Sequence, residues 1–287
     1  MTDTQIPPSL PIAPWREAFV ETPEVRLRYL EWGDPGQASL LLLHGIGQTA
    51  HTWAYFATAM QPYYCVIALD LRGHGESSWA PDGDYSLEAH ARDLDSFLQQ
   101  LKLKDFTIVG FSLGGRSAMW LTDRHPAKVR RLVITDVGPE RPKFAGSQAR
   151  RFMSGPDLLG SVEEFVERSM QFNSRRNREA LRQSLLHNLR QLPDGRWTWK
   201  YDPVLRGPNR QTFPWGDLWP VVARINCPTL IVRGEESPVL APEQAARMLE
   251  LMPDSRMVTI SSAGHTVMGD NPVEFEAKVK PFLLPSL

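Results

Sequence analysis

Short, almost continuously apolar runs alternate with amphipathic segments from Val25 onward, and this alternation constrains the fold more than any other feature of the chain. Runs of this kind are typical of strands buried on both faces of a sheet. When helices join such strands, the sheet is mostly parallel. The predicted strands span residues 39–43, 64–69, 106–109, 131–135, 229–232 and 256–260. We therefore expect an α/β fold with a mostly parallel central sheet flanked by helices.

A crossover helix is predicted between the second and third of these strands. Ser86 is a favourable N-cap, and it precedes apolar residues at helical spacing. These residues are Leu87, Ala91, Leu94, Leu98 and Leu101.

The alternation stops after Asp136, and strand-like runs return only near Thr229. Helices are predicted at 162–172 and 178–192, followed by a turn at 193–195. Because a structureless loop of this length is unusual in a compact domain, we interpret the segment as an inserted helical cap. The predicted organisation is a first core part at 1–138, a helical cap at 139–216 and a second core part at 217–287.

Gly110, Ser112 and Gly114 form a Gly-x-Ser-x-Gly pattern between the strand at 106–109 and a predicted helix at 116–124. This context is the one in which a serine becomes an exposed nucleophile, because the turn from strand to helix is so tight that only glycine fits beside it. Ser112 is the predicted nucleophile.

Two backbone amides are candidates for stabilising an oxyanion beside Ser112. Leu113 opens the helix that follows the serine, where amide groups and the helix dipole favour negative charge. Ile46 lies in the turn His44-Gly45-Ile46-Gly47, which follows the first predicted strand and can direct a second amide at the same oxygen.

These motifs, taken in order, resemble the α/β-hydrolase superfamily. The resemblance rests on the His44-Gly45 turn, the segment 70–77 after a strand, the glycine-flanked Ser112 and the pair Gly264-His265. It covers the first half and the final quarter of the chain, and the segment between is where that superfamily inserts variable caps. It implies a sheet of eight-stranded type and hydrolysis of a carbonyl or similar electrophile.

His265 is the predicted general base. It lies in a loop beyond the last predicted strand, so it can reach the carboxyl edge of the sheet, and it stands last in the order nucleophile, acid, base. His44 and His74 lie in glycine turns and are interpreted as structural. The remaining histidines, His51, His90, His125 and His187, are interpreted as surface residues.

The acid of the triad is the least constrained residue. In many relatives it follows the strand after the cap, where this chain has Ser237, which cannot stabilise an imidazolium by charge. Asp136, at the end of the predicted strand 131–135, is the favoured acid, as in some members of the superfamily. Glu236 is the alternative, followed by Glu235.

The predicted function is hydrolysis of a small-molecule carboxylic ester by a serine hydrolase through an acyl-enzyme. Hydrolysis of a lactone, an amide or a carbon–carbon bond in a small metabolite is the alternative, and a non-catalytic small-molecule receptor is the alternative of another class. Arginines including Arg175, Arg176 and Arg178 are able to bind a substrate carboxylate, although a solvated helix face is the favoured interpretation.

Charge and composition limit the partners of the chain. The 32 Lys and Arg residues balance 33 Asp and Glu residues, so no charge surplus favours nucleic acid. No apolar run approaches the roughly 20 residues that span a bilayer, and the N-terminus lacks the features of a signal peptide. We expect a cytoplasmic protein with a small-molecule substrate, no membrane partner, no metal and no cofactor; a homodimer is left open.

Overall fold

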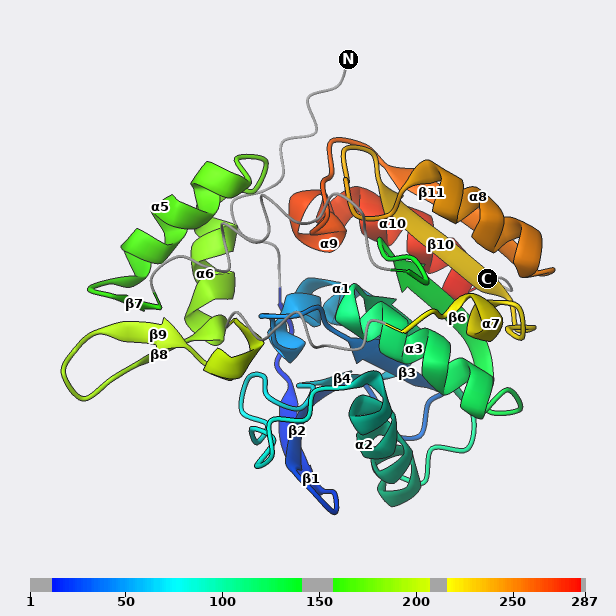
Figure 1. The fold of residues 1–287 in the computed structure, drawn as a ribbon, viewed down its shortest axis with the longest axis horizontal. Coiled ribbons are helices and arrows are strands. Elements are labelled where there is room, and N and C mark those ends of the chain that lie inside the picture. The colour runs from blue at the N-terminus through cyan, green and yellow to red at the C-terminus, as the bar shows by residue number, and fades with distance from the viewer. Residues whose placement is uncertain (1–11, 141–156, 207–215, 285–287) are drawn as a thin grey trace.

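The computed structural model describes residues 12–140, 157–206 and 216–284. Its centre is an eight-stranded sheet with the strand order β1-β2-β4-β3-β5-β6-β10-β11 (Figure 1). The strands are β1 (Arg16–Glu21), β2 (Arg26–Trp32), β3 (Ser39–Leu43), β4 (Cys65–Leu69), β5 (Phe106–Phe111), β6 (Val129–Thr135), β10 (Thr229–Gly234) and β11 (Ser255–Ile260). The six strands from β4 to β11 are parallel, whereas β1 and β2 pair antiparallel at one edge.

The core lies on both faces of this sheet because its strands are apolar throughout. In β3, Leu41 and Leu43 pack into one apolar cluster, and the alternating Leu40 and Leu42 pack into the other. This period of two is the geometry of a strand, and it explains why the run carries no polar face.

Helices cover each face. The first face is covered by α2 (Leu87–Gln100), α3 (Leu113–Arg124), α7 (Trp219–Val222) and α8 (Pro242–Leu251). The second face is covered by the short helix η1 (Ala50–Trp53), α1 (Ala54–Met60), α9 (Val267–Asp270) and α10 (Pro272–Leu283). The Ser86 hydroxyl accepts a hydrogen bond from the Ala89 amide and caps α2, as predicted.

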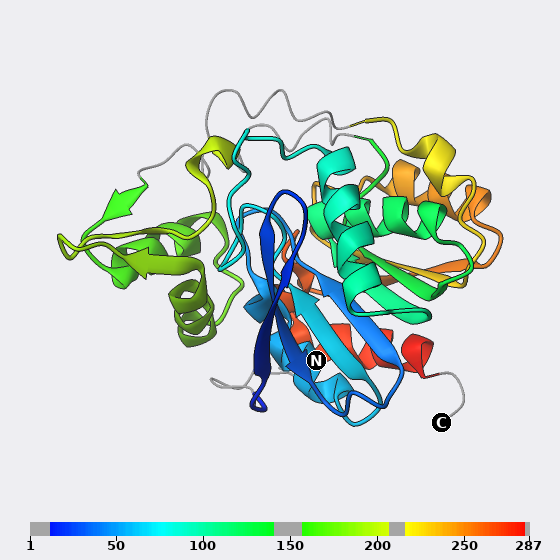
Figure 2. The ribbon, with the colours of Figure 1, turned by 90° about the horizontal axis from the view of Figure 1, so that it is seen from below.

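All six predicted strands are confirmed, with ends that differ from the prediction by up to two residues. The hairpin β1–β2 was not predicted. Four of the six residues of β1 are exposed, so this edge strand carries no apolar run that a sequence pattern could detect (Figure 2).

Residues 157–206 form a separate layer beside the sheet (Figures 1 and 2). It contains α5 (Val162–Phe172), α6 (Arg178–Asn188), the short helix η2 (Pro203–Leu205) and a three-stranded antiparallel sheet, β7 (Leu158–Leu159), β9 (Trp197–Trp199) and β8 (Leu189–Gln191). Its apolar cluster includes Phe165, Leu185 and Trp199.

Two expectations for this layer need correction. The helix expected at 178–192 ends at Asn188, and the chain continues as β8, which turns at 193–195 and pairs with β9. The layer is therefore mixed rather than purely helical, because a hairpin lets Trp199 pack edge-on against Phe165 of α5 with ring centroids 5.0 Å apart.

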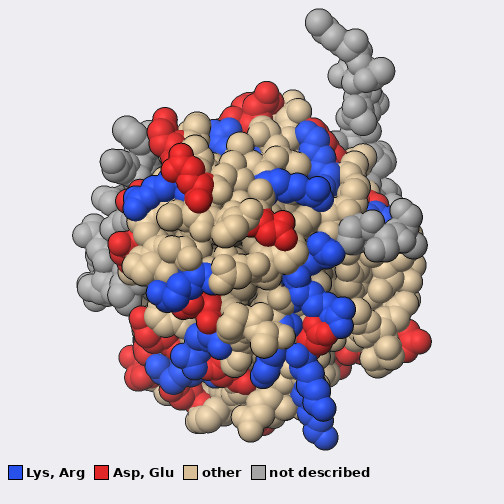
Figure 3. All heavy atoms as spheres, turned by 90° about the vertical axis from the view of Figure 1, so that its right-hand side faces the viewer, with Lys and Arg blue, Asp and Glu red and all other residues tan. Residues whose placement is uncertain are grey.

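Acidic and basic side chains are interspersed on the face of the molecule that Figure 3 shows, in keeping with the balanced composition. Among the described helices, none has the length and apolar character needed to cross a membrane.

Candidate active site

Five neighbouring parallel strands bring the candidate residues to one edge of the sheet. In sheet order, β3 leads to His44, β5 to Ser112, β6 to Asp136, β10 to Ser237 and β11 to His265. The carboxyl ends of parallel strands meet at this edge, which is why residues 221 positions apart in the sequence come together.

Ser112 occupies a strained turn between β5 and α3. Its φ of 52° and ψ of −113° are sparsely populated for a residue with a side chain. The flanking glycines are required by space: a Cβ on Gly110 would lie 2.4 Å from the Gly114 carbonyl oxygen, and one on Gly114 would lie 2.2 Å from the Leu43 carbonyl oxygen. The Ser112 amide bonds to the Thr135 carbonyl at 3.2 Å, which ties the turn to β6.

His265 lies between a hydroxyl and a carboxylate. Its Nε2 is 3.1 Å from Ser112 Oγ, and its Nδ1 is 2.7 Å from Asp136 Oδ2. The carboxylate accepts the hydrogen of Nδ1. In the neutral ring Nε2 therefore carries no hydrogen and can accept the proton of the serine hydroxyl. The ring packs against Phe111, with centroids 4.8 Å apart, and the side chain stays 32% exposed, open to a ligand.

The Asp136 carboxylate is fully buried and accepts three hydrogen bonds. Oδ1 accepts from the Gly234 amide at 3.1 Å, and Oδ2 accepts from both His265 and the Ser237 hydroxyl. Asp136 itself has a positive φ of 49°. The last residue of β10, Gly234, and Ser237 in the turn after it thus supply two donors to the carboxylate. The sequence did not predict this contact of Ser237.

Glu236 and Glu235 lie away from the imidazole nitrogens. Glu236 is 46% exposed and pairs with Arg175, whose Nε is 2.9 Å from Oε2. Glu235 accepts a hydrogen bond from the Ser262 amide at 3.0 Å. Arg233 does not pair with either carboxylate, because its guanidinium donates to the carbonyl oxygens of residues 235, 237 and 240.

The turn that contains Ile46 lies directly against the serine. The Gly114 amide donates to the His44 carbonyl at 3.0 Å, and a Cβ on Gly45 would lie 3.2 Å from Ser112 Cβ. Leu113 is the first residue of α3, so its amide has no acceptor within that helix. The turn that contains Ile46 and the first residue of α3 thus both lie next to Ser112.

His44 controls the orientation of that turn. Its Nε2 accepts from the Leu71 amide at 3.0 Å, so its Nδ1 carries the hydrogen that is donated to the Gly45 carbonyl at 2.7 Å. Burial lowers the pKa of His44 to about 4, so the ring is neutral near pH 7. Because the Gly45 carbonyl and the Ile46 amide share one trans peptide, this bond fixes the direction of the Ile46 N–H.

The surface positions expected for His90, His51 and His187 need correction. His90 is 1% exposed and burial lowers its pKa well below the usual range. His51 stacks on His187 of α6 with centroids 3.6 Å apart, and burial lowers the pKa of His51 to about 2. The interpretation of these residues as surface histidines was wrong, because helix periodicity alone does not show what covers a helix.

Arg116 on α3 connects the helix after Ser112 to both ends of the segment 139–216. This buried guanidinium donates to the carbonyls of Gly138 at 3.0 Å, Pro139 at 2.8 Å and Gly216 at 2.9 Å. The pKa of Arg116 is lowered to about 10 by burial.

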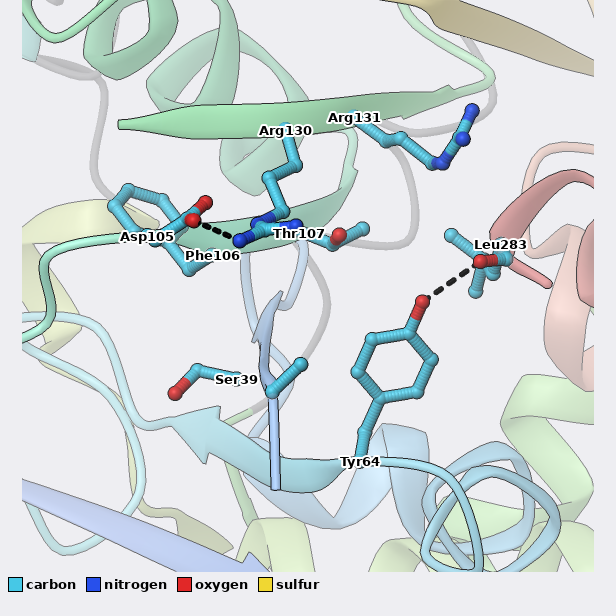
Figure 4. Close-up of a pocket in the computed structure, with 9 residues that line it drawn as sticks. Ser39, Tyr64, Asp105, Phe106, Thr107, Arg130, Arg131 and Leu283 are labelled. Atoms are coloured by element: carbon cyan, nitrogen blue, oxygen red, sulfur yellow. Dashed lines mark hydrogen bonds and ion pairs between the residues drawn. The ribbon is translucent and has the colours of Figure 1, made fainter. Parts of the chain in front are cut away.

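A cavity of about 430 Å³ lies elsewhere, at the opposite edge of the sheet (Figure 4). Residues that line it come from the amino ends of β3, β5 and β6, and Tyr64 points across it to the Leu283 carbonyl at 2.7 Å. Ser112 follows the carboxyl end of β5, so this cavity is not part of the serine site.

Comparisons with known proteins identify the family of the chain. The model of the alpha/beta hydrolase fold family matches residues 38–272. An esterase of Mycobacterium tuberculosis is 31% identical over 85% of this chain and 81% of its own, and N-formylmaleamate deformylase of Pseudomonas putida is 29% identical over 90% of this chain and 93% of its own. The crystal structure of an alpha/beta hydrolase from Novosphingobium aromaticivorans superposes with a TM-score of 0.84 at 25% identity, covering 95% of this chain and 99% of that one.

The family match spans most of the chain, including the strands that carry Ser112 and Asp136 and the loop that carries His265. On this ground the chain belongs to the alpha/beta hydrolase fold family.

Proposed function

We propose that this protein is a serine hydrolase that cleaves a small-molecule carboxylic ester through an acyl-enzyme intermediate. The observation that carries the proposal is the continuous chain of hydrogen bonds from the Ser112 hydroxyl through His265 to the buried Asp136 carboxylate. The esterase relative, which this chain matches over most of its length, supports the choice of an ester.

In the acylation step, Ser112 Oγ attacks the ester carbonyl carbon while its proton moves to His265 Nε2. Asp136 stabilises the imidazolium that forms, and the Ile46 and Leu113 amides receive the oxyanion. When the tetrahedral intermediate collapses, the carbon–oxygen bond breaks, and His265 gives its proton to the leaving alcohol. Deacylation repeats these steps with water as the nucleophile, which releases the carboxylic acid and restores the serine.

Amide hydrolysis is a second candidate because one relative of similar coverage is named a deformylase. The same groups serve both reactions, with His265 protonating an amine instead of an alcohol. A panel of esters, lactones and amides with matched acyl groups separates the candidates by their kcat/KM values.

We further propose that residues 139–216 act as a cap on a core formed by 1–138 and 217–287. Two observations support this division. The layer at 157–206 supplies most of one apolar cluster, which Ala80 and Tyr85 of the core join. Arg116 holds the carbonyls of Gly138 and Gly216, where the chain leaves the core and returns to it.

The test is multiple turnover of p-nitrophenyl acetate or butyrate by the wild type and by two variants. Ser112→Ala is expected to lose at least about 10³-fold in kcat, since the nucleophile is removed. Glu236→Gln is expected to stay within about threefold of the wild type, because an exposed ion pair contributes little. Full activity of Ser112→Ala, or a single slow event in the wild type, contradicts the proposal; the second result is that expected of a receptor.

A further inference from the structure

The turn between α5 and α6, residues 173–177, lies against the loop that carries His265. The Asn173 amide nitrogen donates to Asp270 Oδ1 at 2.7 Å, and the other oxygen of Asp270 accepts from the Gly264 amide at 2.9 Å. Asp270 therefore joins this turn to the backbone immediately before His265.

Two consecutive arginines in this turn have different surroundings. Arg175 is neutralised by Glu236, as described above. Arg176 extends over α9, where a Cβ on Gly269 would lie 3.1 Å from its Cζ and 3.0 Å from the Thr266 methyl group. Its guanidinium thus lies beside the helix that begins two residues after the catalytic candidate His265.

The Arg176 guanidinium has no counter-ion within the described part of the chain. Its Nε is buried without a hydrogen-bond partner, and no salt bridge joins it to a described carboxylate. Asp270 is the nearby acid, but no ion pair joins it to Arg176, and its two oxygens accept from Asn173 and Gly264. Burial lowers the pKa of Arg176 and the charge of Asp270 opposes this shift.

The buried Nε of Arg176 is costly for the folded state, because the desolvation of this N–H is not repaid by a hydrogen bond. A ligand carboxylate repays it, since two of its oxygens match the planar fork of an arginine. We propose that Arg176 binds a carboxylate of the substrate, so that the preferred substrates are esters or amides whose acyl chain ends in a carboxylate. This inference rests on the proposed function and names its substrate class.

The experiment compares p-nitrophenyl butyrate, whose acyl chain is uncharged, with the mono-p-nitrophenyl esters of succinate, glutarate and adipate. The acyl chains of these three esters end in a carboxylate. The wild type is expected to prefer one of the anionic esters in kcat/KM. Arg176→Met is expected to lose at least about 30-fold on that ester, chiefly through KM, and to change less than about threefold on the butyrate. The kcat/KM of Arg176→Lys on the anionic ester is expected to lie between those of the wild type and Arg176→Met. An ammonium group retains the charge but lacks the two parallel N–H donors of a guanidinium.

Arg178→Gln is the matched control. This arginine is the first residue of α6, directly after the turn, and its side chain is 49% exposed and pairs with Glu163 and Glu167. Its loss is therefore expected to leave both activities unchanged.

A thermal measurement separates binding from a structural role. Arg176→Met is expected to unfold at the same temperature as the wild type or higher, because an unpaired charge is removed. Added glutarate or succinate is expected to raise the unfolding temperature of the wild type but not of the variant.

A wild type that hydrolyses butyrate without an anionic preference, or a preference that survives in Arg176→Met, overturns the inference while the proposed function stands. If no ester turns over at all, the proposed function fails, and the dicarboxylate shift in unfolding temperature alone decides whether Arg176 binds carboxylates.

Discussion

Ser237 and His265 share one oxygen of Asp136: the serine hydroxyl and the imidazole Nδ1 both donate to Oδ2. Ser237 follows β10 at the point where many relatives carry the acid, so this chain has a hydroxyl there and a carboxylate one strand away, after β6. The residue after β10 and the histidine after β11 thus meet at one oxygen of the carboxylate that follows β6.

This relationship predicts that the carboxylate of the triad can be transferred from position 136 to position 237. Asp136→Asn is expected to lower kcat by about 10³- to 10⁴-fold, because an amide no longer stabilises the imidazolium or fixes its tautomer. Adding Ser237→Asp is expected to restore at least about tenfold, since the new carboxylate arises from a position already in contact with that site. Steady-state kinetics of the single and double variants check this, and a double variant no more active than Asp136→Asn contradicts it.

The tautomer of His44 predicts a difference between two amide substitutions. Asn places a donor near Nδ1, where it can hold the Gly45 carbonyl, whereas Gln places its polar group near Nε2, where it can contact only the Leu71 amide. His44→Gln is expected to lower kcat at least about tenfold with KM little changed, because the Ile46 amide loses its orientation toward the oxyanion. His44→Asn is expected to retain more of the activity. Equal kcat values for the two variants argue against this role of Nδ1.

Arg116 predicts a large effect on stability. Arg116→Met leaves the buried Gly138 carbonyl without its donor, removes one of the two donors to Pro139, and frees the carbonyl of the exposed Gly216. It is expected to lower the free energy of unfolding by about 2–4 kcal/mol. Arg124→Ala on the same helix removes an arginine that is 47% exposed and paired with Asp95, and it is expected to cost less than about 1 kcal/mol. Urea unfolding measures both values, and equal costs contradict the assignment.

The buried histidines predict that stability falls in acid. The pKa of His44 is about 4, that of His74 about 3 and that of His51 about 2, all lowered chiefly by burial, while in the unfolded chain they titrate near 6.5. Below pH 6.5 the unfolded state therefore binds more protons than the folded state, so the free energy of unfolding decreases as the pH falls. The contribution of His44 alone is about 1.4 kcal/mol per pH unit below 6.5, until its folded pKa is reached.

The stacked pair of His51 and His187 offers a way to test this assignment. The pKa of His187 is also lowered by burial, with Lys200 and Arg28 adding to the shift. His187→Phe retains the ring contact with His51 and removes one titrating group. The dependence of the urea midpoint on pH between 7 and 5 is expected to become shallower in this variant. An unchanged slope means that His187 is not neutral in the folded protein.

The parallel sheet could be predicted because local sequence carries the signal. A strand buried on both faces, such as Leu40 to Leu43, is apolar throughout, and a serine held between Gly110 and Gly114 marks the turn that such a strand makes into a helix. The edge strand β1 carries no such signal, because most of its side chains face solvent and do not need to be apolar.

The sequence by itself determined the order of the strands along the chain, the position of Ser112 at a tight turn and the place of His265 after the last strand. Only the tertiary structure decided that Asp136 rather than Glu236 contacts the imidazole and that Ser237 supports this carboxylate. It also decided that Arg175 forms an ion pair, whereas Arg176 forms none with the described residues. The physical reason is that these are contacts between strand ends and turns far apart in the sequence. Their distances depend on the neighbour order and register of the sheet, which no local pattern of residues encodes.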